Sequence, residues 1–393
     1  MRQAPLFEPL TLPGGTRLAN RIAKAAMSDA LGDGRGNPTA AQIALYRRWA
    51  EGGAGLILVG EVQSDPRFAE KPGNLVLRAD ADLDAFRALA MAGAEGGAQL
   101  WLQLGHAGAM AHPPIGTPKG PSALDLPGLR CAALTTAQIA ALPAQFATTA
   151  RLAKELGFGG VQIHAAHGFL LSQFLSPLFN RRTDRYGGDP AGRMRLLREV
   201  VAAVRAAVGP GSSVGLKLNA TDGLSGGFDS AAALEVLAVL EGAGLDLVEI
   251  SGGTYFPGAP AVSEGRRTGP YFLDFARRAR AVTRTPLMLT GGIRTLAQAT
   301  AVLEEGAADV IGLARAMVLD PALPQAWAHG GPDPAFPRFA DPPANGVTAW
   351  YTQCLAAHAG AATAPPPDAN AALAAYNARD AARVPLWKTR FGG

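Results

Sequence analysis

Two imidazole side chains stand close together where an apolar run of the chain ends. His164 and His167 follow residues 160–163, a strand-like segment, and Gly168 comes next. At a strand end, imidazole N–H groups can polarise a carbonyl group or hold an oxyanion. As metal ligands they would need a third protein ligand, and no nearby Cys, Asp or Glu has suggestive spacing. We therefore predict that His164 and His167 are catalytic residues that bind a substrate oxygen, with no metal.

Two other polar side chains interrupt strand-like apolar segments. Lys217 lies within residues 214–218, and Gln103 lies within residues 99–104. A lysine is costly to bury without a partner, so Lys217 is expected to face a bound anion or an electron-rich ring. The alternative is a lysine at a strand end that reaches solvent. A buried amide needs donors and acceptors, and a heterocycle carrying both would satisfy Gln103.

Composition and motifs exclude several classes of protein. The formal charge is +4 and the arginines are scattered, so a nucleic-acid partner is not expected. Cys131 and Cys354 lie far apart, which gives no metal-binding spacing and no disulfide framework. The chain has neither a nucleophile elbow for acyl transfer nor a Rossmann fingerprint. It also has no signal-peptide pattern and no apolar run of membrane-spanning length, so we expect a cytoplasmic protein.

Strand-like and helical patterns alternate along most of the chain. Strands are predicted at residues 21–27, 55–60, 99–104, 159–163, 214–218, 247–250, 286–289 and 310–313. Helices are predicted at residues 39–51, 82–95, 135–156, 189–208, 230–243, 271–283 and 296–305, with a proline-rich excursion at residues 113–127. This alternation indicates a parallel sheet. Eight such units over roughly 300 residues predict an α/β protein with a closed (β/α)8 TIM barrel.

The two ends of the chain lie outside this alternation. Residues 5–20 surround a Pro-Gly-Gly turn and predict an N-terminal hairpin. The tail is rich in Ala and Pro and predicts a C-terminal extension with one helix, at residues 370–382. We therefore predict a barrel over residues 1–330 and an extension over residues 331–393 that packs on it.

Glycine-rich segments follow the last two predicted strands, at Gly291-Gly292 and around Ala314-Arg315. Loops after the seventh and eighth strands commonly bind phosphate in this fold, because glycine lets backbone N–H groups approach an oxyanion. Arg315 could add two parallel hydrogen bonds to the phosphate. The alternative is that these glycines only permit tight turns.

In order along the chain, these segments resemble the Old Yellow Enzyme family of NAD(P)H:flavin oxidoreductases, whose members are FMN-containing (β/α)8 barrels. The resemblance spans roughly residues 5–325 and is most specific at His164-Ala165-Ala166-His167-Gly168 and at residues 180–188. The other matching segments are Leu6-Phe7-Glu8-Pro9, Asn20-Arg21-Ile22, Ala26-Met27-Ser28, Gln103-Leu104-Gly105-His106, Thr290-Gly291-Gly292 and Gly312-Leu313-Ala314-Arg315.

The resemblance implies FMN as cofactor and NADPH or NADH as electron donor. The residues implied to contact the flavin ring are Ala25, Ala26, Met27, Ser28, Glu61 (mainly through its backbone) and Gln103. Lys217 is implied to lie at N1 and O2, where its charge stabilises the reduced flavin. The residues implied to hold the phosphate are Gly291, Gly292, Ala314 and Arg315. The implied reaction is hydride transfer from flavin N5 to an α,β-unsaturated carbonyl compound whose oxygen is bound by His164 and His167.

The chain departs from the family pattern where a proton donor is expected. Phe169 stands where family members commonly carry tyrosine, and it has no O–H group. Ala30 stands where some members place another active-site tyrosine. The flavin-binding set is thus intact, whereas the proton could come from water, Tyr255 or Tyr351.

Three alternative functions follow from the same residues. The flavin could work oxidatively, in a dehydrogenase or demethylase. The barrel could bind flavin with weak turnover, as a sensor or partner. It could also lack flavin and act on a phosphate ester, although Gln103 and Lys217 together argue against that. The sequence leaves open the natural substrate, the choice between NADH and NADPH, and the oligomeric state, a homo-oligomer included.

Overall fold

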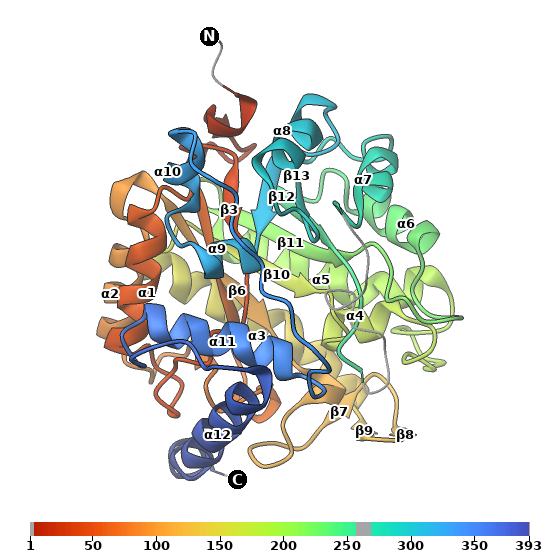
Figure 1. The fold of residues 1–393 in the computed structure, drawn as a ribbon. Coiled ribbons are helices and arrows are strands. Elements are labelled where there is room, and N and C mark those ends of the chain that lie inside the picture. The colour runs from red at the N-terminus through yellow and green to blue at the C-terminus, as the bar shows by residue number, and fades with distance from the viewer. Residues whose placement is uncertain (1–3, 257–268, 393) are drawn as a thin grey trace.

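Eight parallel strands form a closed barrel at the centre of the computed structural model, which describes residues 4–256 and 269–392 (Figure 1). In ring order they are β3 (Ile22–Lys24), β14 (Val310–Leu313), β13 (Leu287–Thr290), β12 (Leu247–Ser251), β11 (Ser213–Asn219), β10 (Gly160–Ala165), β6 (Gln99–Gly105) and β4 (Leu56–Gln63). The pairing of β3 with both β14 and β4 closes the ring. A short strand, β5 (Leu75–Val76), pairs in parallel with the end of β4. The predicted (β/α)8 barrel is confirmed.

Helices follow most of the strands and surround the barrel (Figure 1). They are α1 (Ala40–Glu51), α2 (Leu83–Gly93), α3 (Thr136–Glu155), α5 (Pro190–Val208), α6 (Ser230–Leu240), α7 (Leu273–Ala279) and α8 (Leu296–Glu304). Side-chain hydrogen bonds cap the first turns of several of these helices. Thr39 caps α1 by accepting a hydrogen bond from the Gln42 N–H, and Thr135 forms a capping box with Gln138 at α3.

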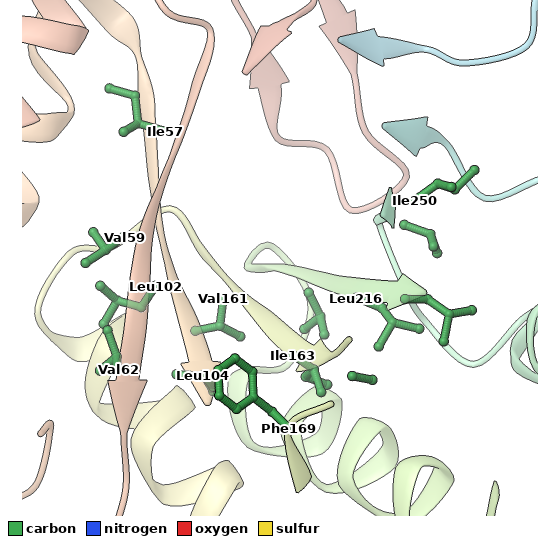
Figure 2. Close-up of a cluster of buried hydrophobic side chains, with 14 of the residues drawn as sticks. Ile57, Val59, Val62, Leu102, Leu104, Val161, Ile163, Phe169, Leu216 and Ile250 are labelled. Atoms are coloured by element: carbon green, nitrogen blue, oxygen red, sulfur yellow. The ribbon is translucent and has the colours of Figure 1, made fainter. Parts of the chain in front are cut away.

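Alternation along each strand separates two environments. On β10, β11 and β12, residues such as Ile163, Leu216 and Ile250 belong to the large apolar cluster shared with the helices. Figure 2 shows part of this cluster, with Phe169 packed among the strand residues. The intervening residues point into the barrel, where Trp101 and its apolar neighbours fill one end. The polar residues of the strands share this inward side at the other end.

The N-terminal hairpin is confirmed as β1 (Leu10–Thr11) paired antiparallel with β2 (Arg17–Leu18). Other segments are more structured than the sequence predicted. The proline-rich excursion at residues 113–127 contains β7 (Lys119–Gly120) and β8 (Leu124–Leu126), which form a small sheet with β9 (Leu129–Ala133). A short helix, α4 (Leu170–Leu175), follows the histidine turn. All six residues of α4 are buried, so it carries no amphipathic pattern.

The helix predicted at residues 370–382 is confirmed as part of α12 (Ala369–Phe391), but the C-terminal extension holds a second helix, α11 (Gly346–His358), that was not predicted. Both helices follow α9 (Arg315–Leu319) and α10 (Leu323–Ala328). α11 packs against α9, α1 and α12, and it is buried on most sides, which removes the periodicity that marks a surface helix. The boundary at residue 330 stays a prediction. Within the described ranges, no helix is long and apolar enough to span a membrane.

Candidate active site

An open cleft lies at the carboxyl ends of β11, β12, β13 and β14. Barrel enzymes place their active sites at this end. Three cations, Lys217, Arg294 and Arg315, line the cleft, and no carboxylate does so among the described residues. The electrostatics of the cleft therefore favour an anionic ligand.

Three glycines, two directly after β13 and one on β14, border the cleft. Gly291 and Gly292 have φ values of 113° and 81°, which side chains rarely tolerate. A Cβ at Gly292 would lie 1.9 Å from the carbonyl oxygen of Gly269, and one at Gly312 would lie 1.9 Å from Thr290 Oγ1, so packing within the protein requires both glycines. The buried Thr290 hydroxyl has no hydrogen-bond partner among the described residues. An unpaired hydroxyl, glycine backbone at the cleft wall and nearby arginines fit the phosphate and ribityl groups of FMN.

Helix α11 contributes to the same part of the cleft. The Arg315 guanidinium lies 5.0 Å from the centre of the Tyr351 ring, within cation–π range. Thr348, one turn earlier on α11, also lines the cleft. Tyr351 therefore lies at the arginine end of the cleft, and no predicted phosphate-site residue came from this helix. Helix α11 is buried on most sides, so its sequence lacks the apolar periodicity that predicts a surface helix.

Lys217 belongs to a buried polar ladder that crosses four neighbouring strands. Its Nζ lies 3.0 Å from Glu249 Oε1, and the two side chains are 3% and 0% exposed. Gln162 Nε2 donates to Glu249 Oε2 over 2.8 Å, and Gln103 Nε2 donates to Gln162 Oε1 over 2.6 Å. Burial excludes the solvent-reaching alternative for Lys217. It lines the cleft, but its direct charge partner is Glu249, which the sequence analysis missed.

Strand register explains why these side chains meet. Lys217 pairs with Glu249 and with His164 across adjacent strands, and Gln103 pairs with Gln162. Glu249, like Lys217, is a charged residue within an otherwise apolar strand. Because each buried charge needs a partner, this common feature could have predicted that the two residues pair.

The two predicted histidines lie side by side but in different surroundings. His164 Nε2 lies 3.3 Å from His167 Nδ1, and His167 Nε2 lies 2.8 Å from Ser251 Oγ. Only His167 lines the cleft, while His164 is buried behind it. His167 has a φ of 60°, and its N–H donates to Asn219 Oδ1. Burial, reinforced by the charge of Lys217, holds the pKa of His167 well below its ordinary value, so this imidazole is neutral.

Glu61 contacts the buried side of this pair. Its carboxylate is 5% exposed, and Oε1 lies 2.9 Å from His164 Nδ1, although the N–H direction of that ring is not aligned with the oxygen. Glu61 has a φ of 56° and sits where the pairing of β4 with β6 shifts register. Such a bulge re-aims a side chain. The sequence analysis gave Glu61 mainly a backbone role and did not predict this carboxylate contact.

The three aromatic residues that bear on the proton step lie in different places relative to the cleft. Phe169 is buried, with its ring centre 5.0 Å from that of His164. Tyr255 is 56% exposed, lines the cleft, and has its ring centre 5.5 Å from that of His167. Tyr351 lies at the arginine end. Of the two predicted tyrosines, Tyr255 is the one beside the histidines.

The remaining residues that were predicted to contact flavin fall into two groups, those that line the cleft and those that do not. Ala26, Met27 and Ala314 line the cleft. Ala25 belongs to the apolar interior of the barrel, and Ser28 Oγ accepts a 3.4 Å hydrogen bond from Asn74 Nδ2. Ser28, like Glu61 and the Gln103 described above, is not among the residues that line the cleft.

Fold and site together define a (β/α)8 barrel with a cleft that is lined by cations beside a histidine pair. Residues 5–333 match the model of the NADH:flavin oxidoreductase / NADH oxidase family. The chain is 38% identical to NADH-dependent flavin oxidoreductase iliE of Neonectria sp. (strain DH2), over 81% of this chain and 46% of that protein. It is 35% identical to NADH-dependent flavin oxidoreductase iccE of Talaromyces variabilis, over 83% and 86%.

The chain is also similar to solved structures of flavin oxidoreductases. Morphinone reductase superposes with a TM-score of 0.73 at 27% identity, covering 85% of this chain and 91% of that one. The chain belongs to this family of FMN-dependent NAD(P)H oxidoreductases. It spans slightly less than half the length of the Neonectria relative, so the comparison concerns the barrel region of that protein.

Proposed function

We propose that this protein reduces the C=C bond of small α,β-unsaturated carbonyl compounds. The observation that carries the proposal is the neutral His167 in the same cleft as Lys217 and the glycine-rich loops. The chemistry supplied by bound FMN is hydride transfer from NADH or NADPH to the β-carbon of such a compound. The side chains of the chain then have to hold the cofactor, bind the carbonyl oxygen and exclude competing reactions.

The cofactor-holding role is divided between the two ends of the cleft. Gly291, Gly292, Ala314 and Arg315 would hold the FMN phosphate at the arginine end, where these residues line the cleft and the charge is positive. Lys217 would face the ring and stabilise negative charge that develops there on reduction. The Glu249 carboxylate behind it moderates that charge, because it neutralises the lysine at 3.0 Å.

The substrate role falls to the histidine turn. His167 Nε2 is the imidazole nitrogen at the cleft, where a carbonyl oxygen would replace Ser251 Oγ as its partner. A hydrogen bond to that oxygen stabilises the charge that develops there when hydride reaches the β-carbon. The α-carbon then needs a proton. Tyr255 would give it; its ring centre lies 5.5 Å from that of His167, which supports this role, and Phe169 has no O–H group.

The experiment is anaerobic reoxidation of the two-electron-reduced holoprotein by 2-cyclohexenone, followed through the visible flavin absorbance. Fast reoxidation that saturates with enone concentration is expected. Cyclohexanone is the matched control, since it has the carbonyl oxygen without the C=C bond, and it should leave the flavin reduced. A panel of enones that reoxidises the flavin no faster than cyclohexanone would contradict the proposal.

A further inference from the structure

Two arginines of the cleft each lie over an aromatic ring. The Arg315 guanidinium carbon lies 5.0 Å from the centre of the Tyr351 ring, and that of Arg294 lies 4.8 Å from the centre of the Phe336 ring. All four residues line the cleft. A guanidinium can stack on an aromatic face while the N–H groups at its edge donate to a second partner. The same arrangement therefore occurs twice at the end of the cleft where an anion is expected.

Both rings come from the C-terminal segment, whereas both arginines follow barrel strands. Arg294 follows β13 and Arg315 follows β14, while Phe336 lies in the loop before α11 and Tyr351 lies on α11. The match to the family model ends at residue 333, before either ring. Membership of the family therefore does not account for these two aromatic residues.

Tyr351 is the more firmly held of the two rings. It is 3% exposed, and its helix packs against α9, α1 and α12. The Trp350 ring centre lies 5.2 Å from that of Tyr351, and Trp350 Nε1 donates to the Pro366 carbonyl oxygen over 3.0 Å. Burial raises the pKa of Tyr351 above its ordinary value, so the phenol is neutral. Its contact with Arg315 is therefore a cation–π contact and not an ion pair.

A supported arginine suits a phosphate ligand. A phosphate monoester carries nearly two negative charges at pH 7 and offers several acceptor oxygens, which a guanidinium can bind in pairs. An arginine side chain that is already held in place loses less freedom when such a ligand binds, so it binds more tightly. The unpaired Thr290 hydroxyl and Gly291 line the same cleft. These groups give the phosphate further hydrogen-bond donors beside Arg315.

We propose that Tyr351 is a positioning residue of the FMN site, whose ring holds the Arg315 guanidinium in the orientation that binds the cofactor phosphate. This role uses the face of the ring and not the O–H group, so it differs from the proton donation considered for Tyr351 in the sequence analysis. The inference rests on the part of the proposed function that places the phosphate at Arg315. It is independent of the substrate.

The test compares the binding of FMN and of riboflavin to the full-length apoprotein, by quenching of flavin fluorescence. The two ligands differ only in the phosphate, so the ratio of their dissociation constants reports on the phosphate site. Tyr351→Leu should weaken FMN binding by about 5–10-fold, the effect of one buried cation–π contact, and riboflavin binding by less than about twofold. Tyr351→Phe keeps the ring and should bind FMN within about twofold of the wild type.

A double-mutant cycle tests whether Tyr351 acts through Arg315. When Arg315→Gln is already present, adding Tyr351→Leu should weaken FMN binding by less than about twofold, because the group that Tyr351 positions is gone. Trp350→Leu is the matched control, since it removes a neighbouring ring of α11 that does not line the cleft. It should keep the wild-type ratio of the FMN and riboflavin dissociation constants. Tyr351→Met replaces Tyr351→Leu if the latter does not fold.

Three results would overturn the proposal. Equal losses of FMN and riboflavin affinity in Tyr351→Leu would show a structural role alone. A loss in Tyr351→Phe as large as that in Tyr351→Leu would assign the effect to the O–H group. Additive losses in the cycle would show that Tyr351 acts independently of Arg315. If Arg315→Gln binds FMN as tightly as the wild type does, the placement of the phosphate fails together with this inference, while enone reduction is decided by its own assay.

Discussion

At the scale of single residues, the site depends on buried charges that meet partners from adjacent strands. Lys217 was predictable as an unusual lysine within an apolar strand, and its place at the cleft agrees with that expectation. Its partner could not be identified from local sequence, because Glu249 becomes a neighbour only through the register of β11 with β12. The same limit applied to Glu61, whose direction depends on a bulge.

The Lys217–Glu249 pair gives a prediction about stability and flavin potential. Glu249→Gln should lower the free energy of unfolding by about 3–5 kcal/mol, because it leaves a buried ammonium without its carboxylate. It should also raise the FMN midpoint potential, because an unneutralised lysine stabilises the reduced, anionic flavin more strongly. Denaturant unfolding and anaerobic redox titration measure the two effects.

The control for that variant is Glu305→Gln, which breaks a 2.9 Å ion pair with Arg277 at the surface. Exposed pairs contribute about 0–1 kcal/mol, so this change should be small and should leave the potential unchanged. Equal unfolding losses for the two variants, or a potential that falls in Glu249→Gln, would contradict the assigned role of the ladder.

At the scale of elements, the strands were predictable and several helices were not. Strands of a closed parallel barrel are buried on both faces and read as continuous apolar runs, which the sequence shows plainly. α4 and α11 are buried on most sides, so neither presents the polar face that identifies a helix. The glycine-rich segments at the ends of β13 and β14 were predictable from their residue types, and they line the cleft as expected, while their phosphate-binding role stays a prediction.

Those two loops give a prediction about cofactor affinity. Arg315→Gln should weaken FMN binding by about 10–100-fold, because it removes a charge-assisted hydrogen bond to the phosphate. Quenching of FMN fluorescence on titration into apoprotein measures the dissociation constant. Arg277→Gln, an exposed arginine on α7, is the matched control and should bind FMN as the wild type does. An unchanged dissociation constant for Arg315→Gln would show that Arg315 does not bind the FMN phosphate.

At the scale of the whole molecule, the barrel and the C-terminal segment form one site. The sequence analysis treated residues 331–393 as an extension that packs on the barrel, and from it named only Tyr351, as a possible proton donor. In the structure, α11 brings Thr348 and Tyr351 into the cleft beside Arg315. Such long-range placement follows from packing of buried faces against α9 and α1, and no local pattern in the sequence encodes it.

The central claim is that this cleft directs hydride to a carbon–carbon double bond. The most direct measurement is product analysis after anaerobic turnover of 2-cyclohexenone with the holoprotein and NADH or NADPH. The account predicts cyclohexanone, with the carbonyl group intact, because the oxygen is held by His167 while the β-carbon receives hydride. Formation of 2-cyclohexenol, or unchanged enone after the flavin has been reduced, would contradict it.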